Sequence, residues 1–136
     1  MQAIATWTGG FRTVLDDGRT HRVTVDLPRE EGGESAGTTA LELCVLSLAG
    51  CITTIFGLVA RRRHLSFDGM TVGLEAEKAQ GATTITRVRG TFRIRTKAPP
   101  EEVATALRLT LKTCPVGVLF EKAGVPVEIT PFTERT

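Results

Sequence analysis

The chain has few of the residues that build metal, hydrolase or nucleotide sites. Its 136 residues include two histidines, His21 and His64, three cysteines and no tyrosine. No Cys-x-x-Cys pair accompanies the histidines, so a zinc site is not expected. A Gly-x-Ser-x-Gly elbow is absent, and the glycine-rich segment 30–37 lacks the Gly-Lys-Ser/Thr ending of a phosphate loop. The sequence therefore gives no support to a zinc protein, a serine hydrolase or a nucleotide-binding loop.

The positive and negative charges nearly balance. The net charge is +2, with 41% hydrophobic and 24% charged residues, which is typical of one ordinary globular domain over 1–136. We expect no strong attraction to nucleic acid or to an anionic membrane. The first seven residues lack the basic flank and apolar core of a signal peptide. Together with the low cysteine count, this predicts a reducing, cytoplasmic setting.

One long apolar run, residues 43–60, is uncharged and is followed by three arginines at 61–63. A short membrane span with a positive flank has the same pattern. The run is near the lower length limit for a span and contains small and polar residues (Ser47, Gly50, Thr53, Thr54 and Gly57). Every other segment has an apolar face that needs a partner, so we interpret the run as a buried central helix. Thr39 and Glu42 have the spacing of a capping box at its start.

Alternation and turn signals predict an α+β domain with the order β-β-β-α-β-β-α-α-β. Strands are expected at 2–8, 11–15, 20–27, 70–77, 83–96 and 125–129, and helices at 39–63, 99–111 and 115–123. Ile85 is out of phase with Val88 and Phe92, which predicts a bulge in the fifth strand. There is no internal repeat or low-complexity segment.

Two cysteines are the main chemical candidates. Cys114 directly precedes Pro115 at the start of a predicted helix, where amide N–H groups and the helix dipole favour a thiolate. Cys51 lies in the apolar run, where a small core residue is the alternative interpretation; a half-buried cap residue is the alternative for Cys114. Cys44 is two turns from Cys51, about 10 Å away, which is too far for a disulfide within one chain. If the fold brings Cys51 and Cys114 together, they form a redox pair.

The sequence resembles a known family, the OsmC/Ohr proteins (osmotically inducible and organic hydroperoxide resistance proteins). The resemblance is carried by Gly32-Gly33, by Thr39-Ala40-Leu41-Glu42-Leu43, by Leu48-Ala49-Gly50-Cys51 and by Thr113-Cys114-Pro115-Val116. The order of strands and helices matches over nearly the whole chain. The resemblance implies an OsmC-like fold, with a long central helix packed on antiparallel sheets, and an intertwined homodimer with two active sites at the subunit interface.

The resemblance also implies roles for single residues. Cys51 matches the cysteine that attacks the peroxide, and Cys114 matches the cysteine that resolves the sulfenic acid as a disulfide. An arginine from the N-terminal strands steadies the thiolate; Arg12 is the best match, with Arg19 and Arg22 as alternatives. No metal, flavin or haem is implied, and the reductant is an unidentified dithiol.

The match departs from the family's peroxidases at the position of their catalytic glutamate, which is Leu41 here. Glu42 is one residue later, about 100° round the helix, and the capping box already accounts for it. The chain therefore resembles the general OsmC-like branch more than the organic-hydroperoxide branch. Glu42 stays a candidate site residue, although we expect it to matter more for stability than for chemistry.

These observations predict a thiol-dependent peroxidase that reduces small organic hydroperoxides through Cys51 and Cys114. Thiolate attack on an O–O bond needs a nearby cation and an apolar pocket for the alkyl group. The alternative is a non-catalytic protein of the same fold that binds a small apolar ligand at the dimer interface. Loss of both thiols after one equivalent of hydroperoxide would favour the enzyme, and unchanged thiols the binding protein.

Overall fold

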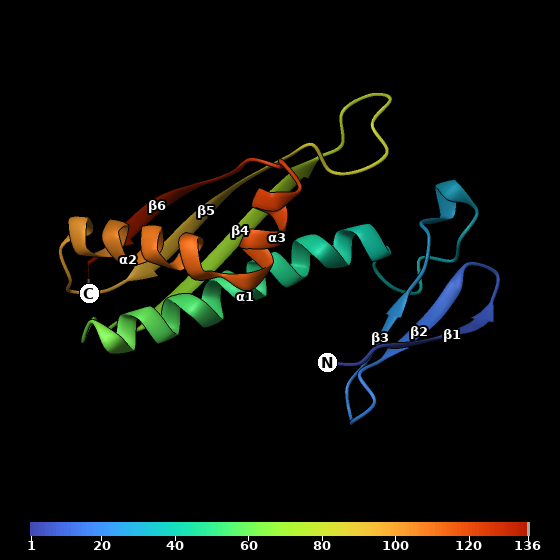
Figure 1. The fold of residues 1–136 in the computed structure, drawn as a ribbon, viewed down its shortest axis with the longest axis horizontal. Coiled ribbons are helices and arrows are strands. Elements are labelled where there is room, and N and C mark those ends of the chain that lie inside the picture. Colours follow the sequence, from blue (N-terminus) through green and yellow to red (C-terminus); the bar gives the residue numbers. More distant parts are fainter. Residues whose placement is uncertain (136) are drawn as a thin grey trace. The chain divides into compact units, whose positions relative to one another are not determined.

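A computed structural model describes residues 1–135. The chain forms two compact units, Met1–Cys44 and Val45–Thr136, which are described separately below; the single domain over 1–136 stays a prediction. The observed order of elements confirms the predicted β-β-β-α-β-β-α-α-β pattern, with one added 3-10 turn (Figure 1). The elements are β1 (Ile4–Gly9), β2 (Arg12–Asp16), β3 (Arg22–Val25), η1 (Arg29–Glu31), α1 (Ala40–Arg62), β4 (Gly69–Glu77), β5 (Arg87–Arg95), α2 (Pro100–Thr113), α3 (Pro115–Lys122) and β6 (Val127–Glu134).

The first unit is an antiparallel sheet in the order β1-β2-β3. The β2–β3 turn forms because carboxylates of Asp16 and Asp17 accept backbone N–H bonds from the residues that follow them, at 2.7 Å from Gly18 and 2.9 Å from Arg19. Gly18 has a φ of +74° there, a conformation that glycine adopts without strain. The predicted hairpin between these strands is therefore confirmed.

A buried carboxylate holds the loop that leads to α1. Asp26 is 3% exposed, and it accepts N–H bonds from Leu27, Glu34 and Ala36 at 2.8 to 3.1 Å. These bonds hold the pKa of Asp26 below its ordinary value, and the bond from Ala36 has the largest effect. Gly37 passes so close to the backbone of Thr24 that any side chain there would collide with it. The glycines of segment 30–37 thus serve the packing of this loop.

In the second unit, helices cover one face of a three-stranded sheet with the order β4-β5-β6 (Figure 1). On α1 the fully buried residues recur every four positions, which is the period of one helix face. They pack against the even-numbered residues of β5 and against one face of α2. This core comprises Leu48, Ile52, Phe56, Ala60, Val88, Phe92, Ile94, Val103, Ala106 and Leu107.

The helix α1 has 23 residues, and an 18-residue window within it has a mean hydropathy of 2.3, so by length and composition it could cross a membrane. The bent pair α2 and α3 passes the same test if it is taken as one span. In this structure, however, α1 presents its fully buried stripe to the sheet, as the central helix of a core does. One face of α1 is thus buried as predicted, but only 22% of the 18-residue apolar window is buried and the opposite face is exposed.

Two details of the second sheet differ from the prediction. The strand β6 runs parallel to β5, whereas antiparallel sheets were predicted. The reason is that α2 and α3 form the crossover connection that a parallel pair requires. The predicted bulge at Ile85 was also wrong: β5 begins at Arg87 and pairs with β4 without interruption, while Ile85 is buried just before the strand.

Candidate active site

The two predicted cysteines meet in the second unit. Cys51 Sγ lies 2.8 Å from Cys114 Sγ, and both are free thiols. A covalent S–S bond is about 2.04 Å long, so joining them requires only a small shift of the side chains. The prediction that the fold brings these residues together is confirmed.

The position of Cys114 follows from the proline after it. The helical region is disfavoured for a residue before proline, and Cys114 has extended φ and ψ angles of −66° and 113°. The chain therefore bends by 66° between α2 and α3. Cys114 ends the first helix and begins the second, and this corner places its side chain against α1 at Cys51.

The two thiols differ in access. Cys114 is 0% exposed and belongs to the fully buried core, whereas Cys51 is only half-buried. A solute arriving from outside therefore reaches Cys51 first.

The electrostatics of Cys114 correct one sequence-based prediction. Its sulfur accepts the N–H of Gly117 at 3.4 Å, as expected for a residue at a helix start. Burial nevertheless dominates, and together with the S–H bond from Cys114 to Cys51 it raises the pKa of Cys114 to about 11. The prediction that the helix start makes Cys114 a thiolate was wrong, because desolvation outweighs the N–H groups there.

Glu42 occupies the capping box that its spacing predicted. Its carboxylate accepts the Thr39 N–H at 2.8 Å and the hydroxyls of Thr39 and Thr38 at 2.9 and 3.1 Å. In return the Thr39 hydroxyl accepts the Glu42 N–H at 3.1 Å. The bonds from Thr39, then that from Thr38, lower the pKa of Glu42. All of these contacts belong to the first turn of α1, so this geometry supports a stabilising role for Glu42.

We expect Glu42→Ala to lower the free energy of unfolding by about 0.5–2 kcal/mol, the usual cost of a lost cap. Because the pKa of Glu42 is lowered in the folded protein, its contribution is fully present above its ordinary value of 4.5 and is lost as the pH falls through the lowered value. Urea unfolding at pH 7 and pH 3 measures both effects. Glu42→Gln, which keeps a capping side chain, is the matched control. Unchanged unfolding with loss of peroxide turnover would assign Glu42 to the chemistry instead.

The three candidate arginines lie in the first unit, and each pairs with a carboxylate there. Arg12 contacts Glu34 at 2.9 Å, Arg19 contacts Asp17 at 2.8 Å, and Arg22 contacts Asp16 at 2.7 Å. The last two pairs stiffen the β2–β3 turn. Of the three, the Arg12 pair joins a strand to the loop before α1, so it does not serve to hold the β2–β3 turn.

Sequence reasoning missed Glu34 as a partner of Arg12. The two residues are 22 positions apart, and Glu34 lies in a glycine-rich loop with no periodicity that predicts its direction. Leu41, at the position of the family's glutamate, is 37% exposed. The thiol of Cys44, the third cysteine, donates to the carbonyl of Ala40 at 3.7 Å. Within residues 1–135, no cluster of three or more histidine, cysteine or acidic side chains could hold a metal ion.

Comparison with known proteins places these observations in a family. A family model described as "OsmC-like protein" matches residues 32–130. No curated protein matches the sequence significantly.

Solved structures match over almost the whole chain. An OsmC-like protein from Mycoplasma pneumoniae has a TM-score of 0.86 at 12% identity, covering 97% of this chain and 95% of its own. An organic hydroperoxide resistance protein from Elizabethkingia anophelis has a TM-score of 0.77 at 18% identity, with coverages of 98% and 97%. An organic hydroperoxide resistance protein OsmC from Legionella pneumophila has a TM-score of 0.72 at 17% identity, with coverages of 96% and 96%. At these identities the likeness establishes the fold.

Proposed function

Because the chain belongs to the OsmC-like family, we propose that it is a thiol-dependent peroxidase that reduces small organic hydroperoxides through Cys51 and Cys114. The observation that carries this proposal is the 2.8 Å separation of the two sulfurs. Similar structures described as organic hydroperoxide resistance proteins support a redox role for this fold. We further propose that the protein acts in the cytoplasm with a dithiol reductant.

In the first step, Cys51 attacks, since it is the thiol that a solute can reach. Its sulfur, as the thiolate, bonds to one peroxide oxygen, and the O–O bond breaks. The products are a sulfenic acid on Cys51 and an alcohol, which takes up one proton. The hydroperoxide is reduced by two electrons, and the sulfur of Cys51 is oxidised by two.

In the second step, Cys114 resolves the sulfenic acid. Its high pKa keeps it a thiol at neutral pH, with its S–H directed at Cys51. As its sulfur bonds to Cys51, the hydroxyl of the sulfenic acid leaves with the Cys114 proton as water. The disulfide is then reduced by a dithiol, which gives up two electrons and two protons and is itself oxidised to a disulfide. The buried position of Cys114 also keeps it from being oxidised by peroxide directly.

We propose that Arg12 supplies the cation for this chemistry, held in place by Glu34. A guanidinium favours the charged form of a thiol and can hydrogen-bond a peroxide oxygen. Glu34, at 2.9 Å from Arg12, would then take the orienting role for which Leu41 has no suitable side chain. Glu42 is occupied with Thr38 and Thr39 and is not needed for this role.

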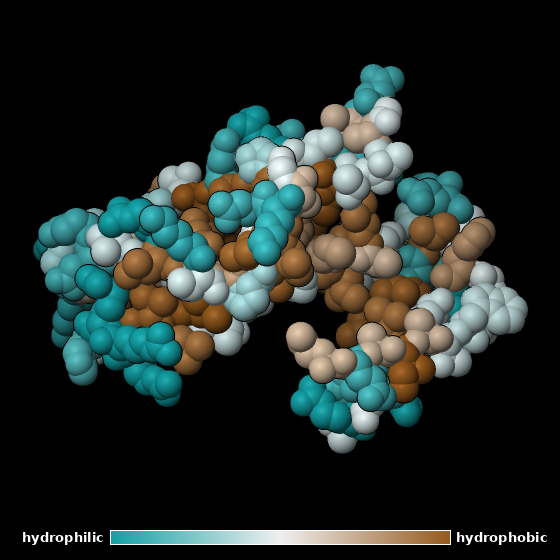
Figure 2. Space-filling model, in the orientation of Figure 1, coloured by the Kyte–Doolittle hydropathy of each residue, from teal (hydrophilic) through white to brown (hydrophobic). Residues whose placement is uncertain are grey.

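We propose that the active protein is a homodimer. On α1, residues spaced by four remain exposed although they are apolar or small: Leu46, Gly50, Thr54 and Leu58, here called the α1 stripe. Cys51 and Gly57 adjoin it, and a side chain on Gly50 or Gly57 would meet nothing within 4 Å. A second copy of α1 could pack closely on such a surface. Figure 2 shows hydrophobic residues exposed over the helices of the second unit. A partner on the α1 stripe would cover the half-buried Cys51.

A titration with cumene hydroperoxide tests the proposed function. One equivalent per chain should remove both thiols and lower the intact mass by two hydrogen atoms, and dithiothreitol should reverse this change. Peptide mapping should find the bond between Cys51 and Cys114, with Cys44 unchanged. Thiols that persist after a tenfold excess of hydroperoxide would contradict the proposal and favour a non-catalytic binding protein.

A further inference from the structure

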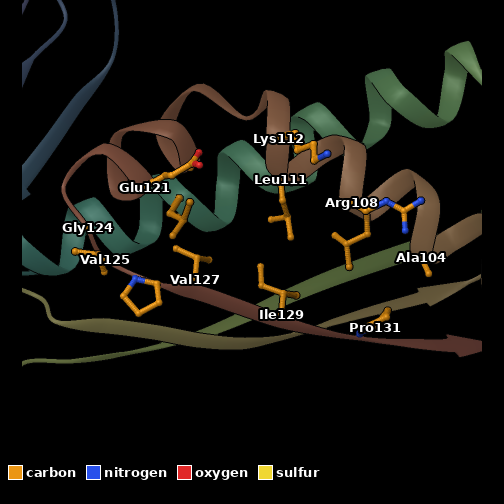
Figure 3. Close-up of a pocket in the computed structure, with 14 residues that line it drawn as sticks. Ala104, Arg108, Leu111, Lys112, Glu121, Gly124, Val125, Val127, Ile129 and Pro131 are labelled. Atoms are coloured by element: carbon orange, nitrogen blue, oxygen red, sulfur yellow. The ribbon is translucent and has the colours of Figure 1, made fainter.

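An open groove in the second unit passes close to Cys114, since Gly117, which lines it, donates its N–H to Cys114 Sγ at 3.4 Å. It runs between α2 and α3 on one side and β6 on the other, and its volume is about 790 Å³ (Figure 3). Small-molecule sites typically occupy about 300–1,000 Å³. Neither Cys51 nor Cys114 lines this α2–β6 groove.

The floor and one wall of the groove are apolar. Val127, Ile129 and Pro131 alternate along β6 and line it from below, while Leu111 faces them from α2 (Figure 3). Leu111, Val127 and Ile129 pack on the core yet remain only half-buried. The face is therefore apolar surface that a ligand could still remove from water.

The groove is elongated. From Val127 to Pro131 the strand advances about 13 Å, and from Ala104 to Lys112 the helix advances about 12 Å. An unbranched chain of intermediate length matches this shape better than a round molecule does.

Two cations border the groove on α2. Arg108 and Lys112 are four residues apart, so they lie on one face of the helix, and both line the groove. Within residues 1–135, neither has a carboxylate partner; Arg108 has only a 3.4 Å contact with the Thr105 hydroxyl. Glu121 also borders the groove, but from α3, toward the end at Gly124 and away from Arg108 (Figure 3).

We propose that the α2–β6 groove binds an amphiphilic carboxylate, with its alkyl chain on the strand floor and its carboxylate on Arg108 and Lys112. A guanidinium binds a carboxylate through two parallel N–H bonds, and an ammonium adds a second charge. A neutral amphiphile gains only the apolar contact, and a cationic one meets two like charges. This ligand site goes beyond the proposed function and does not rest on it.

Calorimetric titration of the full-length protein with decanoate, below its micelle concentration, tests the proposal. We expect saturable binding of one decanoate per chain, with decan-1-ol at least about tenfold weaker, since tenfold corresponds to one good charge-assisted contact. Decyltrimethylammonium should not bind measurably. Equal affinity for all three amphiphiles would overturn the proposal, as would the absence of saturable decanoate binding.

Variants locate the site. The double variant R108Q/K112Q should lower the affinity for decanoate about tenfold or more and leave that for decan-1-ol unchanged. Lys122→Gln, which removes an exposed cation of α3 outside the groove, should change neither affinity. Ala104→Trp fills one end of the groove and should abolish binding of both ligands.

The same variants distinguish a ligand in the groove from a ligand bound elsewhere and from self-association of the chain. If Ala104→Trp leaves decanoate binding unchanged, the ligand binds elsewhere and the proposal is wrong. If Ala104→Trp instead converts dimers into monomers, the groove is a contact between copies of the chain, and the proposal is again wrong. Cumene hydroperoxide titration of each variant shows whether the thiol chemistry persists, so failure of the groove and failure of the proposed peroxidase are distinguishable.

Discussion

Replacement of Cys51 by alanine should abolish hydroperoxide turnover, a loss on the order of 10³-fold or more, while Cys114→Ala should stop the reaction half-way. In Cys114→Ala, one equivalent of cumene hydroperoxide should leave a sulfenic acid on Cys51, because the sulfur that lies 2.8 Å away in the wild type and would displace the hydroxyl is missing. A dimedone adduct detected by mass spectrometry measures it. In Cys51→Ala, the buried Cys114 should remain largely unoxidised, because burial, the largest cause of its raised pKa, does not depend on Cys51 and keeps it protonated at pH 7.

Cys44→Ala is the matched control, since it removes the third thiol and should change neither turnover nor disulfide formation. A sulfenic acid that accumulated on Cys114 in the Cys51→Ala variant would exchange the two roles. Raising the pH toward 11 should make Cys114 increasingly reactive toward iodoacetamide in the reduced protein, and this increase should follow its raised pKa. Rapid alkylation of Cys114 at pH 7 would show that burial does not control its reactivity.

Gly57→Leu should convert the protein from dimer to monomer at micromolar concentration. Peroxide turnover should then fall at least about tenfold, which corresponds to a loss of about 1.4 kcal/mol of transition-state stabilisation. In a single chain a side chain at Gly57 meets nothing within 4 Å, and replacing a helical glycine typically gains up to about 1 kcal/mol in helix stability. Against a second copy of α1, the same leucine occupies space that the partner needs. Sedimentation velocity and circular dichroism measure the two effects.

Two controls make the result specific. Gly57→Ala adds one methyl group and should weaken the dimer less than leucine does. Lys122→Leu adds a leucine to an exposed position of α3 and should leave the dimer intact. A Gly57→Leu protein that remains dimeric would show that the α1 stripe is not the contact surface. A stable wild-type monomer with full turnover would contradict the proposed homodimer altogether.

Local patterns in the sequence were sufficient for most of the fold. The Thr39–Glu42 spacing predicted the cap at the start of α1, because a capping box involves only neighbouring residues. The prolines at 100 and 115 predicted two helix starts for the same reason. The meeting of Cys51 and Cys114 could be stated only as a condition from the residues themselves, and the resemblance to a family supplied the expectation.

The errors concern effects that depend on distant parts of the chain. The N–H groups around Cys114 come from neighbouring residues, but the burial that raises its pKa comes from residues far away in the sequence. The residues around Cys114 therefore reveal only the smaller effect, which lowers the pKa. The direction of β6 depends on the crossover through α2 and α3. Ile85 interrupts the alternation because it is buried outside the strand. Glu34 pairs with Arg12 through a loop path that has no repeating pattern.

The parallel pairing of β6 with β5 has a consequence for how the chain folds. The antiparallel pairs β1–β2, β2–β3 and β4–β5 join strands that are neighbours in the sequence, so they can form early. The β5–β6 pair, in contrast, joins Val88 to Val127, and this long loop must close before any of its backbone bonds form. We therefore expect β6 to dock late, after α2 and α3 have covered the sheet. During synthesis this step waits until the last strand has left the ribosome, and until then the edge of β5 has no partner strand and can pair with other chains.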